Sequence, residues 1–413
     1  MPNTLCLLKL SESCSKAWAV PLGILRLLAP QAGSVSRRLS RAHALPPLSL
    51  GHLRRMTDDT GLLQHATFSV PNYGEGYSID DNARGLIATV QLEELGLGSA
   101  EAVAALAGRY LAFIAHAFNE DAGRFRNFLS FDRHWVEDVG SEDSHGRTLW
   151  ALGMVIGRST DDGHVGLASF LFNRALPAVT AFAAPRAWSF ALLGIHEYLK
   201  RFASDRTVQR ARDDLAARLA QTLSSTSVHD WPWFEDALTY ENATLPRALL
   251  LTGADTQHAA YTEAAITALT WLMALQFGEE EHFIPIGCQG FYHRGEERAR
   301  FDQQPIEAYA TIAACLAAFR VTGDAHWHMQ AQSVFDWFLG RNDLGVSLVD
   351  PATGACYDGL QPDWVNQNQG AESTLAFLLA LLELRAAEAE LVAEEAAREA
   401  EQLVLAKGVA PHV

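Results

Sequence analysis

One pattern occurs six times along this chain of 413 residues: a polar loop with acids or amides leads into a helix whose first turns are small or apolar. The copies begin at Ser78, Gly140, Ala184, Phe234, Phe301 and Asn366, and read SIDDNARGLIATVQLEEL, GSEDSHGRTLWALGMVI, APRAWSFALLGIHEYL, FEDALTYENATLPRALLL, FDQQPIEAYATIAACLAAF and NQNQGAESTLAFLLALLEL. Stretches with apolar residues three and four positions apart separate them, which indicates a second set of helices. This alternation predicts an all-α (α/α)6 toroid, in which an inner ring of six helices is wrapped by an outer ring.

The pattern also gives approximate helix bounds. We expect the inner helices at residues 81–95, 144–156, 186–202, 242–251, 304–321 and 369–384. The outer helices are expected at 101–118, 166–183, 205–223, 256–277 and 324–339. Eleven helices are thus predicted, and the twelfth must come from the C-terminal tail or from residues 48–55. The segment FRNFLSFDRHWVED, from Phe125, alternates apolar and polar residues, which predicts a small β-hairpin insertion.

The connections between these helices differ in length. Those from an inner to an outer helix take only a few residues, whereas four connections from an outer to the next inner helix are long. The long connections span residues 119–143, 224–241, 278–303 and 341–368. Connections of this length inside a compact domain usually carry function. All four should emerge where the inner helices begin, so we expect the functional site on that face of the ring.

The long connections are dense in acids, amides and aromatic residues, a combination typical of sugar binding. Amides, carboxylates and arginines can bind the hydroxyls of a sugar while aromatic rings pack on its C–H surfaces. Glycoside cleavage also needs two carboxyl groups, and one of them needs a raised pKa. The candidate catalytic acids are Asp80, Asp81, Glu235, Asp236, Glu307 and Glu372. The candidate substrate-binding residues are His65, Tyr77, Arg84, Asp143, His145, Arg147, Trp231, Trp233, Tyr240, Asn242, Gln304, Trp364 and Asn368.

Ring geometry suggests how the acids pair. Repeats one and four lie opposite each other in a six-fold ring, so Asp80 or Asp81 is expected to act with Glu235 or Asp236. Glu307 and Glu372 lie about one turn into apolar helices, where an acid facing the lumen would be costly without a purpose.

Several of these residues have a structural alternative. Acids where helices begin, such as Asp80, Asp143 and Glu241, commonly cap backbone N–H groups. Trp231 and Trp233 could pack in the core.

Composition excludes some function classes. The net charge of −17 argues against nucleic acid as a partner. No apolar run approaches the ~20 residues of a membrane-spanning helix. The five cysteines form no CxxC pair and are odd in number, which favours a reduced, cytoplasmic compartment. The sequence has no HExxH, P-loop or GxSxG motif, so we expect neither a metal nor another cofactor.

The chain ends differ from its centre. Residues 1–44 hold six basic residues and one acid, and could be a transit-like leader, a disordered extension or sequence upstream of the true start. Residues 45–386 form the expected toroid. Residues 387–413 are rich in Ala and Glu, which predicts a solvated helix and tail.

Four segments carry a resemblance to a known group of proteins: TDDTGLLQHATFSVPNYGEGYSIDDNARGLI, WPWFEDALTYENATLPRALL, FDQQPIEAYAT and NQNQGAESTLAFLLALLEL. They resemble a bacterial family within the six-hairpin glycosidase superfamily, over roughly residues 46–385. Members of that family are found fused to or beside group-1 glycosyltransferases and mannoside phosphorylases. The resemblance implies a sugar-active toroid, with a group-1 glycosyltransferase as a candidate partner. No nucleotide-binding domain of such a transferase is visible in this sequence.

Three functions are compatible with these observations. The first is a glycoside hydrolase that cleaves a short oligosaccharide, with a mannose-containing one as a candidate substrate. The second is a sugar epimerase or isomerase of the N-acylglucosamine-epimerase type, which would use lumen-facing histidines, for which His65, His145 and His293 are the candidates. The third is a non-catalytic sugar-binding accessory of a glycosyltransferase.

Overall fold

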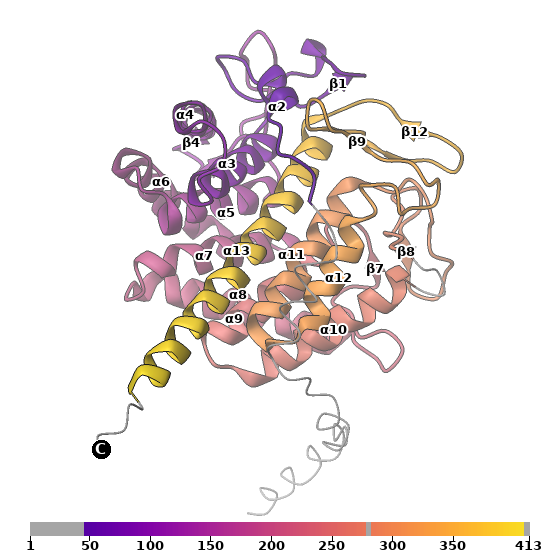
Figure 1. The fold of residues 1–413 in the computed structure, drawn as a ribbon. Helices are drawn as coiled ribbons and strands as arrows, with labels where there is room; N and C mark the ends of the chain where they lie inside the picture. The colour runs from indigo at the N-terminus through magenta and orange to yellow at the C-terminus, as the bar shows by residue number, and fades with distance from the viewer. Residues whose placement is uncertain (1–44, 278–281, 409–413) are drawn as a thin grey trace, which may run out of the picture. The chain divides into compact units, whose positions relative to one another are not determined.

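Six helices form a closed inner ring in the computed structural model, which describes residues 45–277 and 282–408 (Figure 1). They are α3 (Ile79–Glu94), α5 (Glu142–Arg158), α7 (Pro185–Arg201), α9 (Thr244–Asp255), α11 (Pro305–Thr322) and α13 (Ala371–Gly408). Each helix packs against the next in this order, and α13 closes the ring on α3. The (α/α)6 toroid predicted from the repeats is therefore confirmed.

The outer ring follows the same order. Its helices are α4 (Ala100–Ala117), α6 (Asp162–Ala175), α8 (Arg206–Thr226), α10 (Ala259–Phe277) and α12 (Ala325–Phe335). Each packs against the inner helix that precedes it in the chain. The short helix α2 (Gly51–Met56) packs on α13 and so stands at the sixth outer position, one of the two origins predicted for the twelfth helix. After α6 the chain continues as a 3₁₀ helix, η2 (Leu176–Ala181), and Pro177 lies in its first turn.

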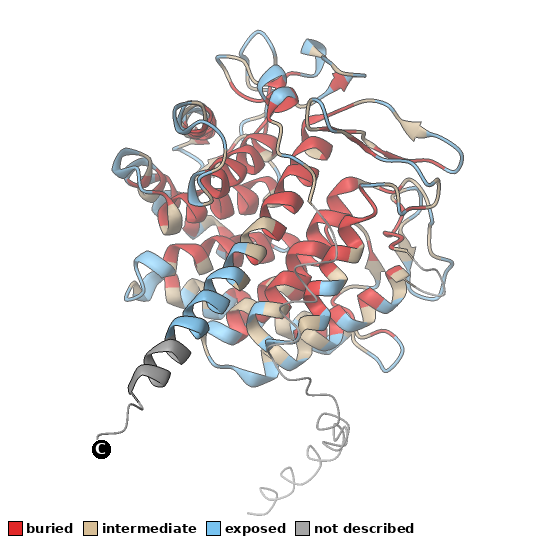
Figure 2. Cartoon of the chain, viewed as in Figure 1, coloured by how far each residue is buried: buried red, intermediate tan, exposed pale blue. Residues whose placement is uncertain are grey.

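Burial distinguishes the two rings (Figure 2). On α11 every residue from Pro305 to Ala318 is buried, as expected for a helix that is apolar all round. The outer helix α8 instead buries a single stripe, which includes Val208, Leu215 and Leu219. The inner ring thus forms the core of the molecule, and the outer ring faces solvent.

Six small antiparallel sheets lie in the connections that precede inner helices. The pairs are β1 (Ala66–Thr67) with β2 (Val70–Pro71), β3 (Tyr77–Ser78) with β6 (Phe128–Leu129), β4 (Phe118–Asn119) with β5 (Arg124–Phe125), β7 (Ala237–Leu238) with β8 (Tyr292–His293), β9 (Val349–Asp350) with β10 (Ala355–Cys356), and β11 (Gly359–Leu360) with β12 (Val365–Asn366). The long connections therefore do meet the N-terminal ends of the inner helices, as predicted. The segment from Phe125 turns back at 130–134 as expected, but its strand β6 also pairs with β3, far away in the sequence.

The predicted leader, residues 1–44, lies outside the described residues. Helix α13 runs without a break past residue 387, and its residues from 388 to 400 are mainly exposed (Figure 2). Within the described ranges, no helix is long and apolar enough to cross a membrane.

Candidate active site

Asp80 and Asp143, which lie in the first turns of α3 and α5, do not cap these two helices. Helix α3 is capped by Ser78, whose Oγ accepts from the backbone N–H of Asp81 at 3.1 Å. Helix α5 is capped in the same way by Ser141, whose Oγ accepts from the N–H of Ser144 at 3.0 Å. The side chain of Asp80 instead accepts from Arg147. The capping role considered for Asp80 and Asp143 is therefore taken by serines, which leaves both carboxyl groups to other partners.

Arg147 of α5 joins acids from two other repeats. Its Nε donates to Oδ1 of Asp80 at 2.8 Å, and its Nη1 donates to Oε1 of Glu241 at 2.9 Å. The guanidinium also stacks over the ring of Phe190, 4.1 Å from its centroid. Glu241 is only 1% exposed, so this ion pair is fully buried at the start of the inner helices.

Arg84 of α3 and Arg186 of α7 extend the network. Arg84 contacts Oδ1 of Asp81 at 3.1 Å and Oε2 of Glu372 at 2.8 Å. Arg186 donates to Oε2 of Glu235 at 2.7 Å and to the backbone oxygen of Tyr240 at 2.6 Å. Consecutive inner helices thus each supply one buried arginine, and most of the predicted catalytic acids bind these three side chains.

Glu307 and Asp143 lie within the same network. Glu307 is buried and accepts hydrogen bonds from the backbone N–H of Glu241 and from Nδ2 of Asn242, the latter at 2.9 Å. Burial raises the pKa of Glu307 to about 7, although its hydrogen bonds lower it. Asp143 accepts from the hydroxyl of Tyr240, and burial raises its pKa to about 6.

A cavity of about 340 Å³, here called the site cavity, opens beside this network. Its described lining comes mainly from repeats one, five and six, which are neighbours in the ring: Gln64, His65, Ser78, Asp80, Asp81, Arg84, Phe128, Asp302, Gln304, Asp358, Asn366, Gly370, Glu372 and Ser373. Five of these residues are acids and one is an arginine, so carboxyl groups dominate the lining.

Three of the lining acids have a raised pKa. Burial raises the pKa of Asp81 to about 6 against the charge of Arg84. Burial also raises the pKa of Asp302 to about 6, against a hydrogen bond from Gln361, with a further rise from the nearby Asp358. The pKa of Asp358 is itself raised by burial, although the N–H of Gly370 donates to its Oδ1 at 2.7 Å. The cavity can therefore hold protonated and charged carboxyl groups side by side.

Several predicted residues do lie at this site. Asp80, Asp81, Arg84, Gln304, Glu372 and His65 line the site cavity, and Arg147, Glu307, Asn242, Asp143, Tyr240 and Glu235 lie in the network beside it. Trp364 and Asn368 line a wider groove, described below.

Other predicted residues lie elsewhere. Asp236, with a side chain 81% exposed, pairs with Arg294 on the β7–β8 hairpin. Trp231 and Trp233 are buried and pack against Trp271, the core alternative considered for both. His145 is buried against the backbone oxygen of Ala175, and burial lowers its pKa to about 3.

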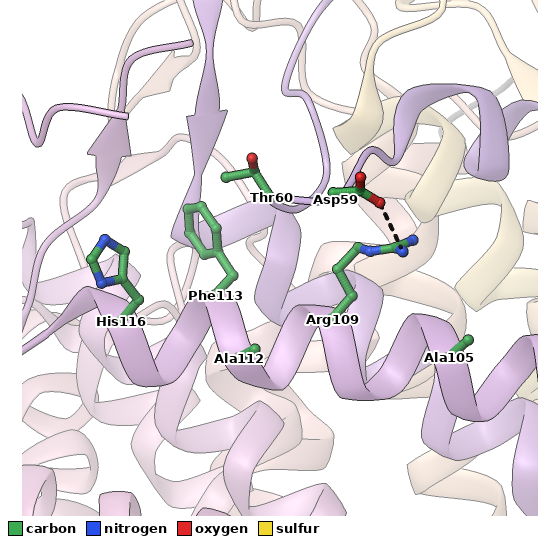
Figure 3. A pocket seen from close by; sticks show the side chains of 7 residues that line it. All are labelled: Asp59, Thr60, Ala105, Arg109, Ala112, Phe113 and His116. Atoms are coloured by element: carbon green, nitrogen blue, oxygen red, sulfur yellow. Dashed lines mark hydrogen bonds and ion pairs between the residues drawn. The ribbon is translucent and has the colours of Figure 1, made fainter. Parts of the chain in front are cut away.

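Tyr77 is buried beside a different hollow, which Figure 3 shows from close by and whose lining residue Phe113 it contacts. Its hydroxyl donates to Oδ2 of Asp58 at 2.6 Å, and its ring packs against Phe113. Phe113, Arg109 and His116 rise from one face of α4 beneath Asp59 and Thr60, where they line this outer hollow of about 360 Å³. Asp59 is the one acid among the described residues that line this hollow, and it is nearly fully exposed and pairs with Arg109. The outer hollow therefore lacks the buried acids of the site cavity.

The sequence-based candidates omit several contributors, among them Glu241, which binds Arg147, and Asn366, which lines the cavity. Asp302 and Asp358 line the cavity, and Arg186 anchors Glu235. Asp302 carries a signal that could have found it, because it stands directly before the fifth inner helix, as Asp80 stands at the first. Arg186 follows the short connection before α7, where no long loop marks it. Among the described residues, no group of three or more His, Cys, Asp and Glu side chains is arranged to hold a metal ion.

Known proteins resemble this chain in fold but not in sequence. No family model matches it, and no curated protein does. A cellobiose 2-epimerase from Bacillus thermoamylovorans is 11% identical, with a TM-score of 0.61 over 86% of this chain and 100% of that one. A GH76 α-mannanase from Bacteroides thetaiotaomicron is 10% identical, with a TM-score of 0.56 over 88% of this chain and 98% of that one. A C. cellulolyticum cellulase in complex with cellobiose is 11% identical, with a TM-score of 0.55 over 78% and 87% of the two chains.

At these identities the matches establish the fold alone, an (α/α)6 toroid. The matched proteins include both epimerases and hydrolases, so the matches do not distinguish the hydrolase function from the epimerase function.

Proposed function

We propose that this protein is a glycoside hydrolase that cleaves an oligosaccharide in the site cavity. The observation that carries the proposal is that an acid with a pKa near 6, Asp302, lines the same cavity as an arginine-bound acid, Asp80. Glycoside cleavage needs one carboxyl group that donates a proton and a second one that is charged.

Asp302 is the proposed general acid. Its raised pKa keeps a proton available up to about pH 6, which is what protonation of the leaving oxygen requires. Its Oδ1 is buried and has no hydrogen-bond partner among the described residues, a setting that favours the protonated, neutral carboxyl.

Asp80 is the proposed base or nucleophile. The Nε of Arg147 donates to its Oδ1 at 2.8 Å and places a positive charge beside it. Its carboxylate would either activate a water molecule or attack the anomeric carbon. Gln304 and Asn366, which also line the cavity, supply amides for sugar hydroxyls.

The proposal is tested by turnover of cello-oligosaccharides and α-1,6-linked manno-oligosaccharides by the full chain. Asp302→Asn and Asp80→Asn should each lower kcat by about 10²–10⁴-fold, the usual contribution of a general acid or base. Asp236→Asn is the matched control and should keep wild-type turnover, because that carboxylate is exposed on the β7–β8 hairpin. Wild-type rates for both cavity variants would refute this assignment.

An epimerase is the second candidate, and one observation favours it. His65 lines the site cavity beside Asp358, whose pKa it lowers. An epimerase would move a proton at a sugar carbon, so its product would have the mass of its substrate in H₂O and would gain deuterium in D₂O. Deuterium incorporation that His65→Asn abolishes would replace the hydrolase proposal with this one.

The accessory role predicts a third result. The protein would bind a glycan saturably without any product, and would co-purify with a glycosyltransferase. The candidate partnership with a group-1 glycosyltransferase is thus tested by the same purified protein.

A further inference from the structure

A groove of about 800 Å³ adjoins the site cavity, and Asn366 lines both. We call it the hairpin groove, because much of its lining surrounds the β11–β12 hairpin near the start of α13 (Figure 1). Its described lining residues are Phe68, Leu344, Val346, Tyr357, Asp363, Trp364, Val365, Asn366, Gln367 and Asn368. It is more than twice as large as the site cavity.

Two aromatic rings are displayed in this groove. Trp364 is 54% exposed and Phe68 is 59% exposed, although both are large apolar side chains. Phe68 has a φ of 51°, in the left-handed region that bulky residues seldom adopt. Its N–H donates to Oδ1 of Asn368 at 2.9 Å, and its carbonyl accepts from the N–H of Gln369 at 2.9 Å. The aromatic surface is therefore held in place by the same segment that lines the groove.

The polar part of the groove is nearly neutral. Asn366, Gln367 and Asn368 supply amides, and Asp363 is the one charged residue among the described lining residues. Without a lining cation, the groove offers no counter-charge to a sulfated or acidic glycan. Exposed aromatic faces beside amides suit the C–H surfaces and hydroxyls of neutral sugars.

The groove is tied to an acid of the site cavity. The N–H of Asp358 donates to the carbonyl of Asn366 at 3.1 Å and to that of Asn368 at 2.9 Å. These hydrogen bonds hold the segment that lines the groove against an acid that lines the site cavity.

We propose that the hairpin groove binds further units of a neutral, linear oligosaccharide whose scissile end lies in the site cavity. The substrate class would then be chains of three or more sugars, with Trp364 and Phe68 as the platform for the distal units. This inference rests on the proposed function, because it assumes that a sugar occupies the site cavity.

The test uses binding as well as turnover. The full chain with Asp302→Asn is titrated with cello- and α-1,6-linked manno-oligosaccharides of two to six units, by calorimetry. Affinity in one series should rise with length, and Trp364→Ala should weaken binding of the hexasaccharide by about tenfold or more while leaving the disaccharide nearly unchanged. Trp364→Tyr should restore much of the loss. Phe170→Ala, which removes an exposed aromatic ring on α6, is the matched control and should change neither.

The outcomes separate this inference from the hydrolase proposal. Length-dependent binding that Trp364→Ala abolishes supports the groove even if the wild-type chain releases no product. Turnover that is equal for short and long chains and unaffected by Trp364→Ala would overturn the proposal for the hairpin groove and leave the hydrolase proposal intact. Absence of binding by every oligosaccharide in both series would also overturn it.

Discussion

Arg147 is the residue on which the site network depends most. It is buried, stacks on Phe190 and binds Asp80 and Glu241, which come from two different repeats. A buried ion pair contributes little net stability, but removal of one partner leaves an uncompensated charge. Arg147 therefore serves to hold acids in position more than to stabilise the fold.

This view predicts an asymmetric response to mutation. Arg147→Met should destabilise the protein by about 3–5 kcal/mol, because Glu241 would stay buried with only its longer contact to Arg84 at 3.8 Å. Glu241→Gln in the same chain should recover part of that loss. Arg294→Met should cost less than about 1 kcal/mol, because Arg294 pairs with an exposed carboxylate. Urea unfolding measures all three, and equal losses for Arg147→Met and Arg294→Met would contradict this reading.

At the scale of elements, the contact between α5 and α7 is the tightest part of the inner ring. A Cβ at Gly153 would clash with the carbonyl oxygen of Gly194, and a Cβ at Gly194 would lie 2.5 Å from the carbonyl oxygen of Leu149. The two backbones can approach this closely only without side chains. Since Arg147 lies in the second turn of α5 and Arg186 in the first turn of α7, the contact also sets the spacing of these two arginines.

Glycine substitutions on two helices test this packing. Gly153→Ala should destabilise the protein by about 1–3 kcal/mol through overpacking, despite the better helix propensity of Ala. Gly166→Ala on α6, where a Cβ would meet no atom within 4 Å, should stabilise it by about 0.5–1 kcal/mol. Thermal unfolding of the two variants compares them directly, and a stabilised Gly153→Ala would show that the helices are not in contact as described.

At the scale of the whole molecule, the site has more buried acids than arginines, which links stability to pH. The pKa of Glu307 rises on folding from its ordinary value of 4.5 to about 7, mainly through burial, so the folded state binds the proton more tightly. The stabilisation is fully present below about pH 4.5 and is lost as pH rises through 7. For this group alone the loss amounts to about 3 kcal/mol.

Glu307→Gln should accordingly flatten the fall in unfolding free energy between pH 4.5 and 7.5. Asp81, Asp143 and Asp302, whose pKa values are also raised by burial, should leave part of the slope in place. Chemical denaturation across this range provides the measurement. An unchanged slope in the variant would mean that Glu307 is charged in the folded protein at neutral pH.

The sequence predicted the architecture better than the site. Apolar spacing on helices such as α11 reflects burial directly, so the rings and the long-loop face were predictable. The direction of a side chain within a loop depends on which distant segment that loop pairs with. No local sequence pattern encodes this pairing. Pairing of β7 with β8 places Asp236 in solvent, while its neighbour Glu235 binds Arg186. Opposite repeats were expected to supply the acids, yet the cavity gathers them mainly from neighbouring repeats.

The central claim is that the site cavity hydrolyses a glycan, and cleavage in H₂¹⁸O tests it most directly. The full chain is incubated with cello- and α-1,6-linked manno-oligosaccharides, and the products are weighed by mass spectrometry. The account predicts shortened chains with one ¹⁸O atom for each bond cleaved, formed by the wild type and lost in Asp302→Asn. A product with the mass of its substrate, or labelled cleavage that persists at the wild-type rate in Asp302→Asn, would contradict it.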